Sequence, residues 1–285
     1  MSGRVEEGRL GYLKTAAFCR PSTVMSRSGE AAENHWEEKM EHRNRAEGKN
    51  VFLFDLDGTL TDPAQGITKS VQYALRSYGI EVEHLEELYP FIGPPLRDSF
   101  QEYYHFSPER AGEAILRYRE YFAVRGIFEN EVYPGIPELL EALSSRGAVL
   151  AVATSKPEVF AEQILAHFGL RQYFHCVAGA DMEETRVKKG DVIRYCFEKM
   201  GLPPECRSRC LMIGDRMHDV AGAAQAGIDC VGAGYGFAED GELEEAGAVF
   251  VAENVRQLSE YLLAALETGN NDCRADIIPA HTMPA

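Results

Sequence analysis

Two aspartates separated by a single residue follow an apolar run in this sequence. The run is Val51–Phe54, and Asp55 and Asp57 come directly after it, with Gly58 next. Two carboxylates this close raise each other's pKa unless a cation lies beside them, so the pair is a candidate metal site. The alternative is an Asx turn at a strand end, in which Gly58 supplies a positive φ angle. We favour a functional site, because the whole string lies where the carboxyl end of a strand is expected.

A second acidic pair follows another short apolar run. Leu211–Ile213 leads into Gly214 and Asp215, and Asp219 comes four residues later. A spacing of four at the start of a helix puts both carboxylates on one side. Asp215 alone would be interpreted as a helix cap. Together with the first pair, however, these side chains offer the oxygen ligands that Mg²⁺ prefers, so the sequence predicts a magnesium site.

Two weaker features could bind an anion. Thr154 and Ser155 end a third apolar run and precede a helix, so their hydroxyl and amide groups could hold phosphate oxygens. Their alternative role is an ordinary helix N-cap, and the two roles can coexist. Lys188 and Lys189 precede another helix and could neutralise a phosphate, although a lysine pair is more often a solvated surface.

All these residues lie at the ends of short apolar runs that alternate with helical patterns. Alternation of this kind predicts an α/β fold, with a parallel sheet covered by helices on both faces. The predicted strands are Val51–Phe54, Val149–Ala153, Cys176–Ala178, Leu211–Ile213, Cys230–Val231 and Val249–Val251, and the predicted helices include Ile136–Ser145, Pro157–His167, Lys189–Met200 and Val220–Ala226.

One long interruption breaks the alternation. Residues 66–132 show helical patterns only, and an insertion of this length is too large for a simple connection after the first strand. We therefore predict a separate all-helical cap there, and a core formed by residues 50–65 and 133–267. Residues 1–49 and 268–285 lack a sustained period, and we interpret them as a disordered or start-site-uncertain extension and a frayed tail.

The predicted cap contains a rigid turn, Gly93-Pro94-Pro95, which opens a helix with Arg97 in its first turn. We predict that this turn faces the substrate and that Arg97 contacts a carboxylate or a second phosphate. The alternative is a plain helix start with a solvated arginine.

Composition argues against two classes of partner. The chain of 285 residues carries 29 Lys and Arg against 45 Asp and Glu, a net charge of −16, so it lacks the basic footprint of a protein that binds a nucleic-acid polymer. Its longest apolar run, Ala148–Ala153, is far too short to span a bilayer, so we expect no membrane insertion. Seven scattered cysteines fit reduced thiols, and we expect a cytoplasmic protein.

Taken in order, the motifs resemble those of the haloacid dehalogenase-like (HAD) hydrolase superfamily. The chain looks most like the phosphoglycolate phosphatase-like branch, in which a helical cap follows the first motif. The resemblance implies a Rossmann-like sheet, in agreement with the alternation. It covers about residues 50–267 and is carried by the string Asp55-Leu56-Asp57-Gly58-Thr59, by Thr154-Ser155, by a lysine before a helix, and by Gly214-Asp215 with Asp219.

The resemblance also implies catalytic roles. Asp55 would attack phosphorus and become an aspartyl phosphate, while Asp57 would protonate the leaving oxygen and then activate water. Thr154 and Ser155 would hold the phosphoryl group. Lys189, which fits the spacing of the motif better than Lys188, would neutralise it. The motif commonly has asparagine where Ser155 stands, so a contact from a side-chain amide would be lost here.

The metal ligands implied by the resemblance come from both acidic pairs. Asp55, the backbone carbonyl of Asp57, and Asp215 would bind Mg²⁺, and Asp219 would either touch the metal or stand behind its ligands. The second aspartate also discriminates within the superfamily. Haloacid dehalogenases lack it and P-type ATPases carry another residue there, so the chain resembles the phosphatases and phosphomutases.

The implied function is therefore a Mg²⁺-dependent phosphatase of small phosphorylated metabolites, with phosphoglycolate as the substrate that the branch suggests. A 5′-nucleotidase is the near alternative. A β-phosphoglucomutase-like phosphotransferase is a further one, recognisable by its dependence on a bisphosphate primer. A binding module without activity is disfavoured because both acidic pairs are intact.

Overall fold

The computed structural model describes residues 48–267. The predicted extension and tail lie outside this range, apart from Gly48 and Lys49. Lys49 is buried, and its ammonium lies 2.9 Å from Oδ2 of Asp229 and donates to the carbonyl oxygen of Cys210. The packed core thus includes the residue just before its predicted start.

The core is a single sheet of six parallel strands, which confirms the predicted fold class. The strand order is β5-β4-β1-β6-β7-β8, so β1 lies between β4 and β6. Leu53 of β1 pairs with Ala151 on one side and with Met212 on the other. The strands are β1 (Val51–Phe54), β4 (Val149–Pro157), β5 (Cys176–Ala180), β6 (Cys210–Gly214), β7 (Asp229–Ala233) and β8 (Phe250–Ala252).

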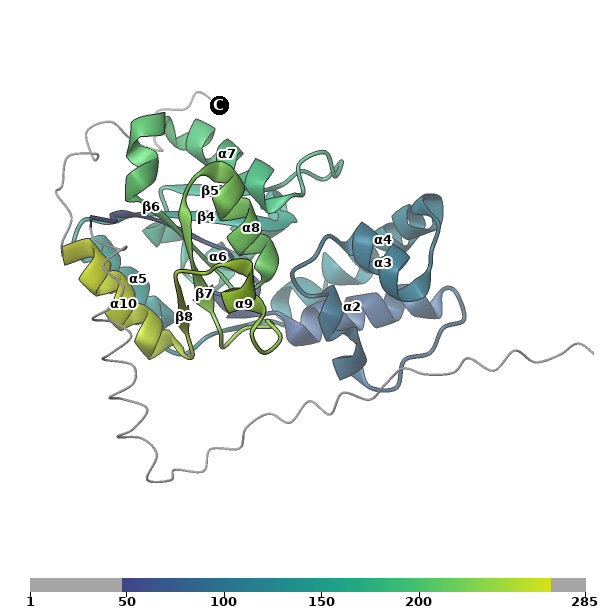
Figure 1. Cartoon of the computed structure of the whole chain (residues 1–285). Helices are drawn as coiled ribbons and strands as arrows, with labels where there is room; N and C mark the ends of the chain where they lie inside the picture. The colour runs from purple at the N-terminus through teal and green to yellow at the C-terminus, as the bar shows by residue number, and fades with distance from the viewer. Residues whose placement is uncertain (1–47, 268–285) are drawn as a thin grey trace, which may run out of the picture. The chain divides into compact units, whose positions relative to one another are not determined.

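Helices cover both faces of the sheet (Figure 1). Successive side chains of a strand point to opposite faces, and β1 shows this directly. Val51 and Leu53 belong to the apolar cluster that includes residues of α7 and α8, whereas Phe54 packs edge to face on Phe174. The helices are α5 (Ile136–Ser145), α6 (Glu158–His167), α7 (Lys189–Met200), α8 (Met217–Ala226), α9 (Glu242–Ala246) and α10 (Val255–Glu267), with short 3₁₀ turns η3 (Arg171–Tyr173) and η4 (Pro204–Arg209).

The structure differs from the predicted elements mainly at their ends. Helices α5 and α7 have the predicted bounds, but β4 continues to Pro157 instead of ending at Ala153. Its register with β5 shifts between these two residues, so the strand is irregular there. Helix α8 starts at Met217, three residues before the predicted Val220.

A helical bundle lies between β1 and β4 in the chain. Helix α4 packs against both α2 and α3, and the ring of Phe100 contacts those of Phe91 and Phe106. A short antiparallel ribbon of β2 and β3 connects the bundle to the sheet. The elements are β2 (Thr61–Asp62), α2 (Ala64–Arg76), η1 (Leu85–Phe91), α3 (Leu96–Tyr104), α4 (Pro108–Phe122), η2 (Gly126–Phe128) and β3 (Glu131–Val132).

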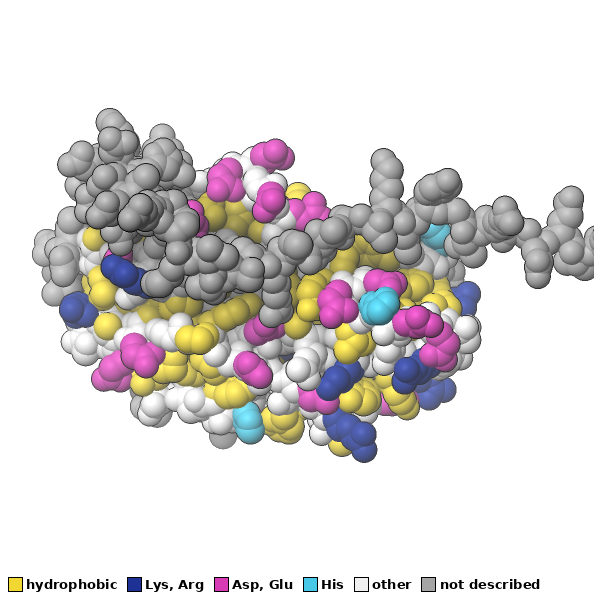
Figure 2. Space-filling model, turned by 90° about the horizontal axis from the view of Figure 1, so that it is seen from below, with side chains coloured by type: hydrophobic (Ala, Val, Ile, Leu, Met, Phe, Trp, Pro, Cys, Tyr) yellow, Lys and Arg dark blue, Asp and Glu magenta, His cyan; other side chains and the backbone are white. Residues whose placement is uncertain are grey.

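Two surface observations bear on partners. No helix within residues 48–267 is long and apolar enough to cross a membrane. On the face shown in Figure 2, acidic side chains are spread widely, and basic side chains lie among them.

Candidate active site

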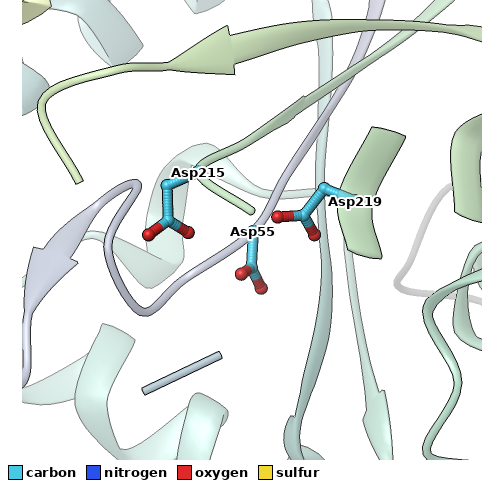
Figure 3. Close-up of side chains that lie close together, drawn as sticks. All are labelled: Asp55, Asp215 and Asp219. Atoms are coloured by element: carbon cyan, nitrogen blue, oxygen red, sulfur yellow. The ribbon is translucent and has the colours of Figure 1, made fainter. Parts of the chain in front are cut away.

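Three aspartates from the two acidic motifs meet at the carboxyl edge of the sheet (Figure 3). Asp55 follows β1, Asp215 follows β6, and Asp219 lies in the first turn of α8. One carboxylate oxygen of each lies within 4.8 Å of the others, and no residue of the three is more than 5% exposed. The amide of Asp55 donates to the carbonyl oxygen of Ile213, so pairing of β1 with β6 brings the motifs together.

Glycines allow the carboxylates to approach this closely. A Cβ atom on Gly58 would lie 1.9 Å from Oδ2 of Asp215, and a Cβ on Gly236 would lie 2.4 Å from the Cβ of Asp215. Gly58 also has a φ of +81°, which favours glycine. The glycine after Asp57 thus leaves room for a carboxylate from a distant part of the chain.

Burial and mutual repulsion make this cluster unfavourable without a cation. Burial raises the pKa of Asp215 well above its ordinary value, and the charges of Asp219 and Asp55 raise it further. Burial also raises the pKa of Asp219, to about 6. Oδ1 of Asp215 has no hydrogen-bond partner among the described residues. These oxygens therefore fit a small hard cation such as Mg²⁺.

Lys189 supplies positive charge to the same cluster. Its ammonium lies 2.7 Å from Oδ1 of Asp55 and 2.8 Å from Oδ1 of Asp219. Burial lowers the pKa of Lys189, but the two carboxylates outweigh burial and the net shift is upward. Lys188 is exposed. The structure thus brings only the second lysine of the pair to the aspartates.

Asp57 pairs with a lysine that is absent from the predicted site. Its Oδ2 lies 2.5 Å from Nζ of Lys156, and both residues are buried. Burial raises the pKa of Asp57, and Lys156 offsets only part of that rise. The available signal was a lysine directly after Thr154 and Ser155. In this segment the predicted site stops at Ser155.

Thr154 and Ser155 line a cavity together with Asp55 and Asp57. Thr154 is almost fully buried, and its hydroxyl accepts a hydrogen bond from the amide of Lys156 at 3.3 Å. Both hydroxyl residues lie within β4, and the residue that precedes α6 is Pro157. The alternative role as the N-cap of α6 is therefore wrong.

The helical bundle lines the other side of this cavity. Its contribution comes from the Gly93-Pro94-Pro95 turn, from Arg97 and from aromatic rings that include Phe122. The guanidinium of Arg97 donates to Glu184, from Nε at 2.9 Å and from Nη2 at 2.5 Å. In this structure the arginine expected to meet a substrate carboxylate is thus paired with a carboxylate of the protein.

A second arginine connects the bundle to the acidic motif. Arg216 follows Asp215, and its Nη1 donates to the carbonyl oxygen of Ile92 at 3.0 Å. Its Nε donates to Glu242 at 2.9 Å, which fixes the guanidinium. The peptide just before Gly93 is therefore held against the segment that carries Asp215 and leads into α8.

Comparison with known proteins gives consistent matches. The sequence pattern of the haloacid dehalogenase-like hydrolases matches residues 52–233. A 5′-nucleotidase from Pseudomonas aeruginosa is 52% identical over 192 residues, which cover 67% of this chain and 86% of that protein. Tyrosine-protein kinase PtkA from Mycobacterium tuberculosis is 38% identical over 76% of this chain and 73% of its own. Phosphoglycolate phosphatase 1 from Pseudomonas aeruginosa is 29% identical over 73% of this chain and 78% of its own.

A solved structure supports the same assignment. The crystal structure of a predicted phosphatase from Clostridium acetobutylicum superposes with a TM-score of 0.73 and 47% sequence identity, over 76% of this chain and 99% of that one. The family pattern spans both acidic motifs and the helical bundle between them. The chain therefore belongs to the haloacid dehalogenase-like hydrolases and is a phosphatase of that family, a hydrolase of phosphoric monoesters.

Proposed function

We propose that this phosphatase requires Mg²⁺ and hydrolyses small phosphomonoesters through an aspartyl phosphate on Asp55. The observation that carries the proposal is the buried meeting of Asp55, Asp215 and Asp219 beside a cavity that Asp55 and Asp57 line. In this proposal residues 66–132 are the cap, and residues 50–65 and 133–267 are the catalytic core.

The two aspartates of the first motif divide the reaction. A carboxylate oxygen of Asp55 attacks phosphorus, the bond to the leaving oxygen breaks, and Asp57 gives that oxygen a proton. Asp57 then takes a proton from the water that attacks the phosphorylated Asp55, which releases phosphate. One oxygen of Asp57 pairs with Lys156, whereas Oδ1 has no hydrogen-bond partner among the described residues. We therefore propose that Oδ1 of Asp57 is the atom that donates and later accepts the proton.

The proposed metal ligands are Asp55, Asp215 and the backbone carbonyl of Asp57, with Asp219 beside them. The metal would supply positive charge against the phosphoryl oxygens. Asp219 is already engaged, because Oδ1 pairs with Lys189 and Oδ2 accepts from the amide of Arg216 at 3.1 Å. We therefore propose that Asp219 orients Lys189 and the segment Asp215-Arg216.

Three residues are proposed to hold the phosphoryl group, namely Lys189, which contacts Asp55, and the cavity-lining Thr154 and Ser155. Lys189 fixes Asp55 by direct contact and adds positive charge on the side of α7. Thr154 and Ser155 line the cavity beside the aspartates, where their polar groups can donate to phosphoryl oxygens. A cation and a lysine together explain how an acidic chain binds an anionic substrate.

For the substrate we favour a nucleoside monophosphate over phosphoglycolate. The relative named 5′-nucleotidase is much more similar to this chain than the one named phosphoglycolate phosphatase. The cavity offers aromatic rings, those of Phe91, Phe122 and Phe160, as apolar surface for a nucleoside. Arg97, which would be needed for the carboxylate of phosphoglycolate, is occupied by Glu184.

Phosphate release from a substrate panel tests this proposal. The panel contains nucleoside 5′-monophosphates, phosphoglycolate, sugar phosphates with and without a bisphosphate, and p-nitrophenyl phosphate, all with Mg²⁺. We expect the highest kcat/KM on a nucleoside monophosphate. A preference for phosphoglycolate would replace the substrate assignment, and a requirement for the bisphosphate would indicate a phosphotransferase. No release from any compound would contradict the proposed hydrolysis.

A further inference from the structure

Two arginines of the cap converge on one carboxylate of the core. Arg97 of α3 donates to Oε2 of Glu184 through two nitrogens. Arg119 of α4 places Nη2 3.8 Å from Oε1 of the same residue and donates from Nη1 to the carbonyl oxygen of Met182. Both arginines and Glu184 line the cavity that contains the reactive aspartates. The glutamate therefore lies inside the proposed binding site.

The cationic side chains that line the cavity are all paired with carboxylates of the protein. The lining residues that the structure describes include three cations, Arg97, Arg119 and Lys156. The two arginines share Glu184, and Lys156 pairs with Asp57. Each of these cations already has a carboxylate of the protein as its partner. A second anionic group on a substrate would have to compete with Glu184, and such competition is an effective way to reject a ligand.

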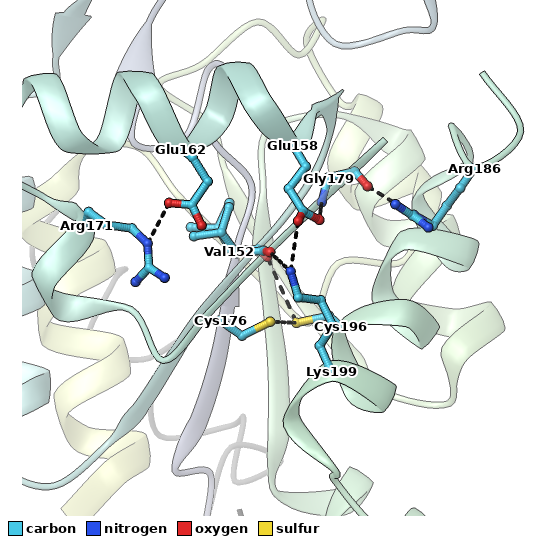
Figure 4. A network of polar contacts seen from close by, with 10 residues as sticks. Val152, Glu158, Glu162, Arg171, Cys176, Gly179, Arg186, Cys196 and Lys199 are labelled. Carbon is cyan, nitrogen blue, oxygen red and sulfur yellow. Dashed lines mark hydrogen bonds and ion pairs between the residues drawn. The ribbon is translucent and has the colours of Figure 1, made fainter. Parts of the chain in front are cut away.

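The loop that carries Glu184 is anchored on both sides. Before it, Asp181 accepts hydrogen bonds from the amide and the hydroxyl of Thr185. After it, Nε of Arg186 donates to the carbonyl oxygen of Gly179 at 3.1 Å, as Figure 4 shows. Glu184 itself has a φ of +60°, which is uncommon for a residue other than glycine. The loop therefore holds the carboxylate in one place.

From this geometry we propose that Glu184 is a specificity-determining residue. By occupying Arg97 and Arg119, it excludes phosphomonoesters that carry a second anionic group and leaves those whose leaving group is uncharged. This role rests on the proposed phosphatase function and narrows its substrate class. In this role the carboxylate that Arg97 binds belongs to Glu184 and not to the substrate.

A matched pair of substrates isolates this effect. Glycerol 3-phosphate and 3-phosphoglycerate differ in one group, which is hydroxymethyl in the first and a carboxylate in the second. We expect the wild type to prefer glycerol 3-phosphate. Glu184→Gln should raise the ratio of kcat/KM for 3-phosphoglycerate to that for glycerol 3-phosphate about tenfold, because the freed arginines can form charge-assisted hydrogen bonds. The control Glu183→Gln changes an exposed neighbour and should leave the ratio unchanged.

Two further variants distinguish a change in specificity from a general loss of folded protein. Glu184→Gln with Arg97→Ala should lose most of the gain in the ratio, because one of the two arginines that would donate to the substrate carboxylate is removed. Glu184→Asp keeps the charge but shortens the side chain, and should give a smaller rise of the same sign.

Several outcomes would overturn the inference. One is a Glu184→Gln variant that still releases phosphate from p-nitrophenyl phosphate but whose ratio of kcat/KM for 3-phosphoglycerate to that for glycerol 3-phosphate is unchanged. A loss of activity by the same factor on both substrates counts as an unchanged ratio. That result would leave the proposed function standing. A wild-type chain that releases no phosphate even from p-nitrophenyl phosphate would instead overturn the proposed function, and this inference with it.

Discussion

The ammonium of Lys156 lies 2.5 Å from Oδ2 of Asp57, and neither side chain is more than 10% exposed. The same ammonium lies 4.7 Å from the centroid of the Phe122 ring, which belongs to α4 of the cap. Lys156 therefore touches the proposed proton donor and the cap at once. Through this one side chain, the position of Asp57 is linked to the position of the cap.

Replacement of this lysine should impair proton transfer selectively. Lys156→Met removes the partner that orients Asp57, so turnover of an alkyl phosphate should fall by about tenfold or more relative to turnover of p-nitrophenyl phosphate. The reason is that p-nitrophenolate leaves without a proton, whereas an alkoxide needs one. The measurement is kcat for both substrates. Equal losses on the two would show that Lys156 supports the fold or the cap instead of proton transfer.

The two adjacent lysines provide a matched comparison. Lys189→Met leaves Asp55 and Asp219 buried without their ammonium partner, and loss of one partner from a buried ion pair costs about 3–5 kcal/mol. We expect a clear drop in melting temperature without Mg²⁺ and little phosphatase activity. Lys188→Met, at an exposed position, should change neither. Similar behaviour of both variants would argue against a role for Lys189 in the acidic cluster.

Two glycines with similar φ angles allow the cost of an unfavourable backbone conformation to be measured apart from the cost of a steric clash at the metal site. Gly58 has φ of +81° and a new Cβ would collide with Asp215, whereas Gly79 has φ of +73° and open space around it. Gly79→Ala should cost only about 1 kcal/mol of stability, from its backbone conformation. Gly58→Ala should in addition weaken Mg²⁺ binding and abolish activity. Calorimetric titration with Mg²⁺ checks this, and unchanged affinity in Gly58→Ala would contradict the assigned metal site.

Removal of divalent cations tests whether phosphate release requires the metal. EDTA should abolish phosphate release, and added Mg²⁺ should restore it. Ca²⁺ should support it poorly because its larger and looser coordination shell misplaces the attacking carboxylate. Mg²⁺ should also raise the melting temperature, since a ligand that binds the folded state stabilises it. Full activity after exhaustive chelation would exclude the metal from the reaction.

Much of the fold could be predicted from the sequence, because each core element leaves a local pattern. The apolar run Val51–Phe54 coincides with β1, and the bounds of α5 and α7 agree with the periodic stretches Ile136–Ser145 and Lys189–Met200. The ribbon of β2 and β3 could not be predicted, since strands of two residues are too short to show an alternation. The extension of β4 to Pro157 depends on pairing with β5, which is a tertiary contact.

Candidate site residues with a local motif could be predicted, and those defined by distant contacts could not. Asp55 and Asp215 each follow an apolar strand, so their convergence follows from the parallel sheet. Glu184 lies in a loop without a pattern, and its partner Arg97 is 87 positions away in the chain. The sequence therefore indicates Arg97 as a cation at the cavity but gives no sign of the anion that occupies it.

Asp55 is the proposed nucleophile, and replacement of its reacting oxygen tests that role most directly. Asp55→Asn keeps the shape of the side chain, so the fold should persist, while steady-state phosphate release with Mg²⁺ should fall below about a hundredth of wild type. Asp240→Asn, which changes an exposed aspartate, serves as the control and should retain wild-type activity. Residual release by Asp55→Asn above about a hundredth of wild type would contradict the assignment of Asp55 as the nucleophile.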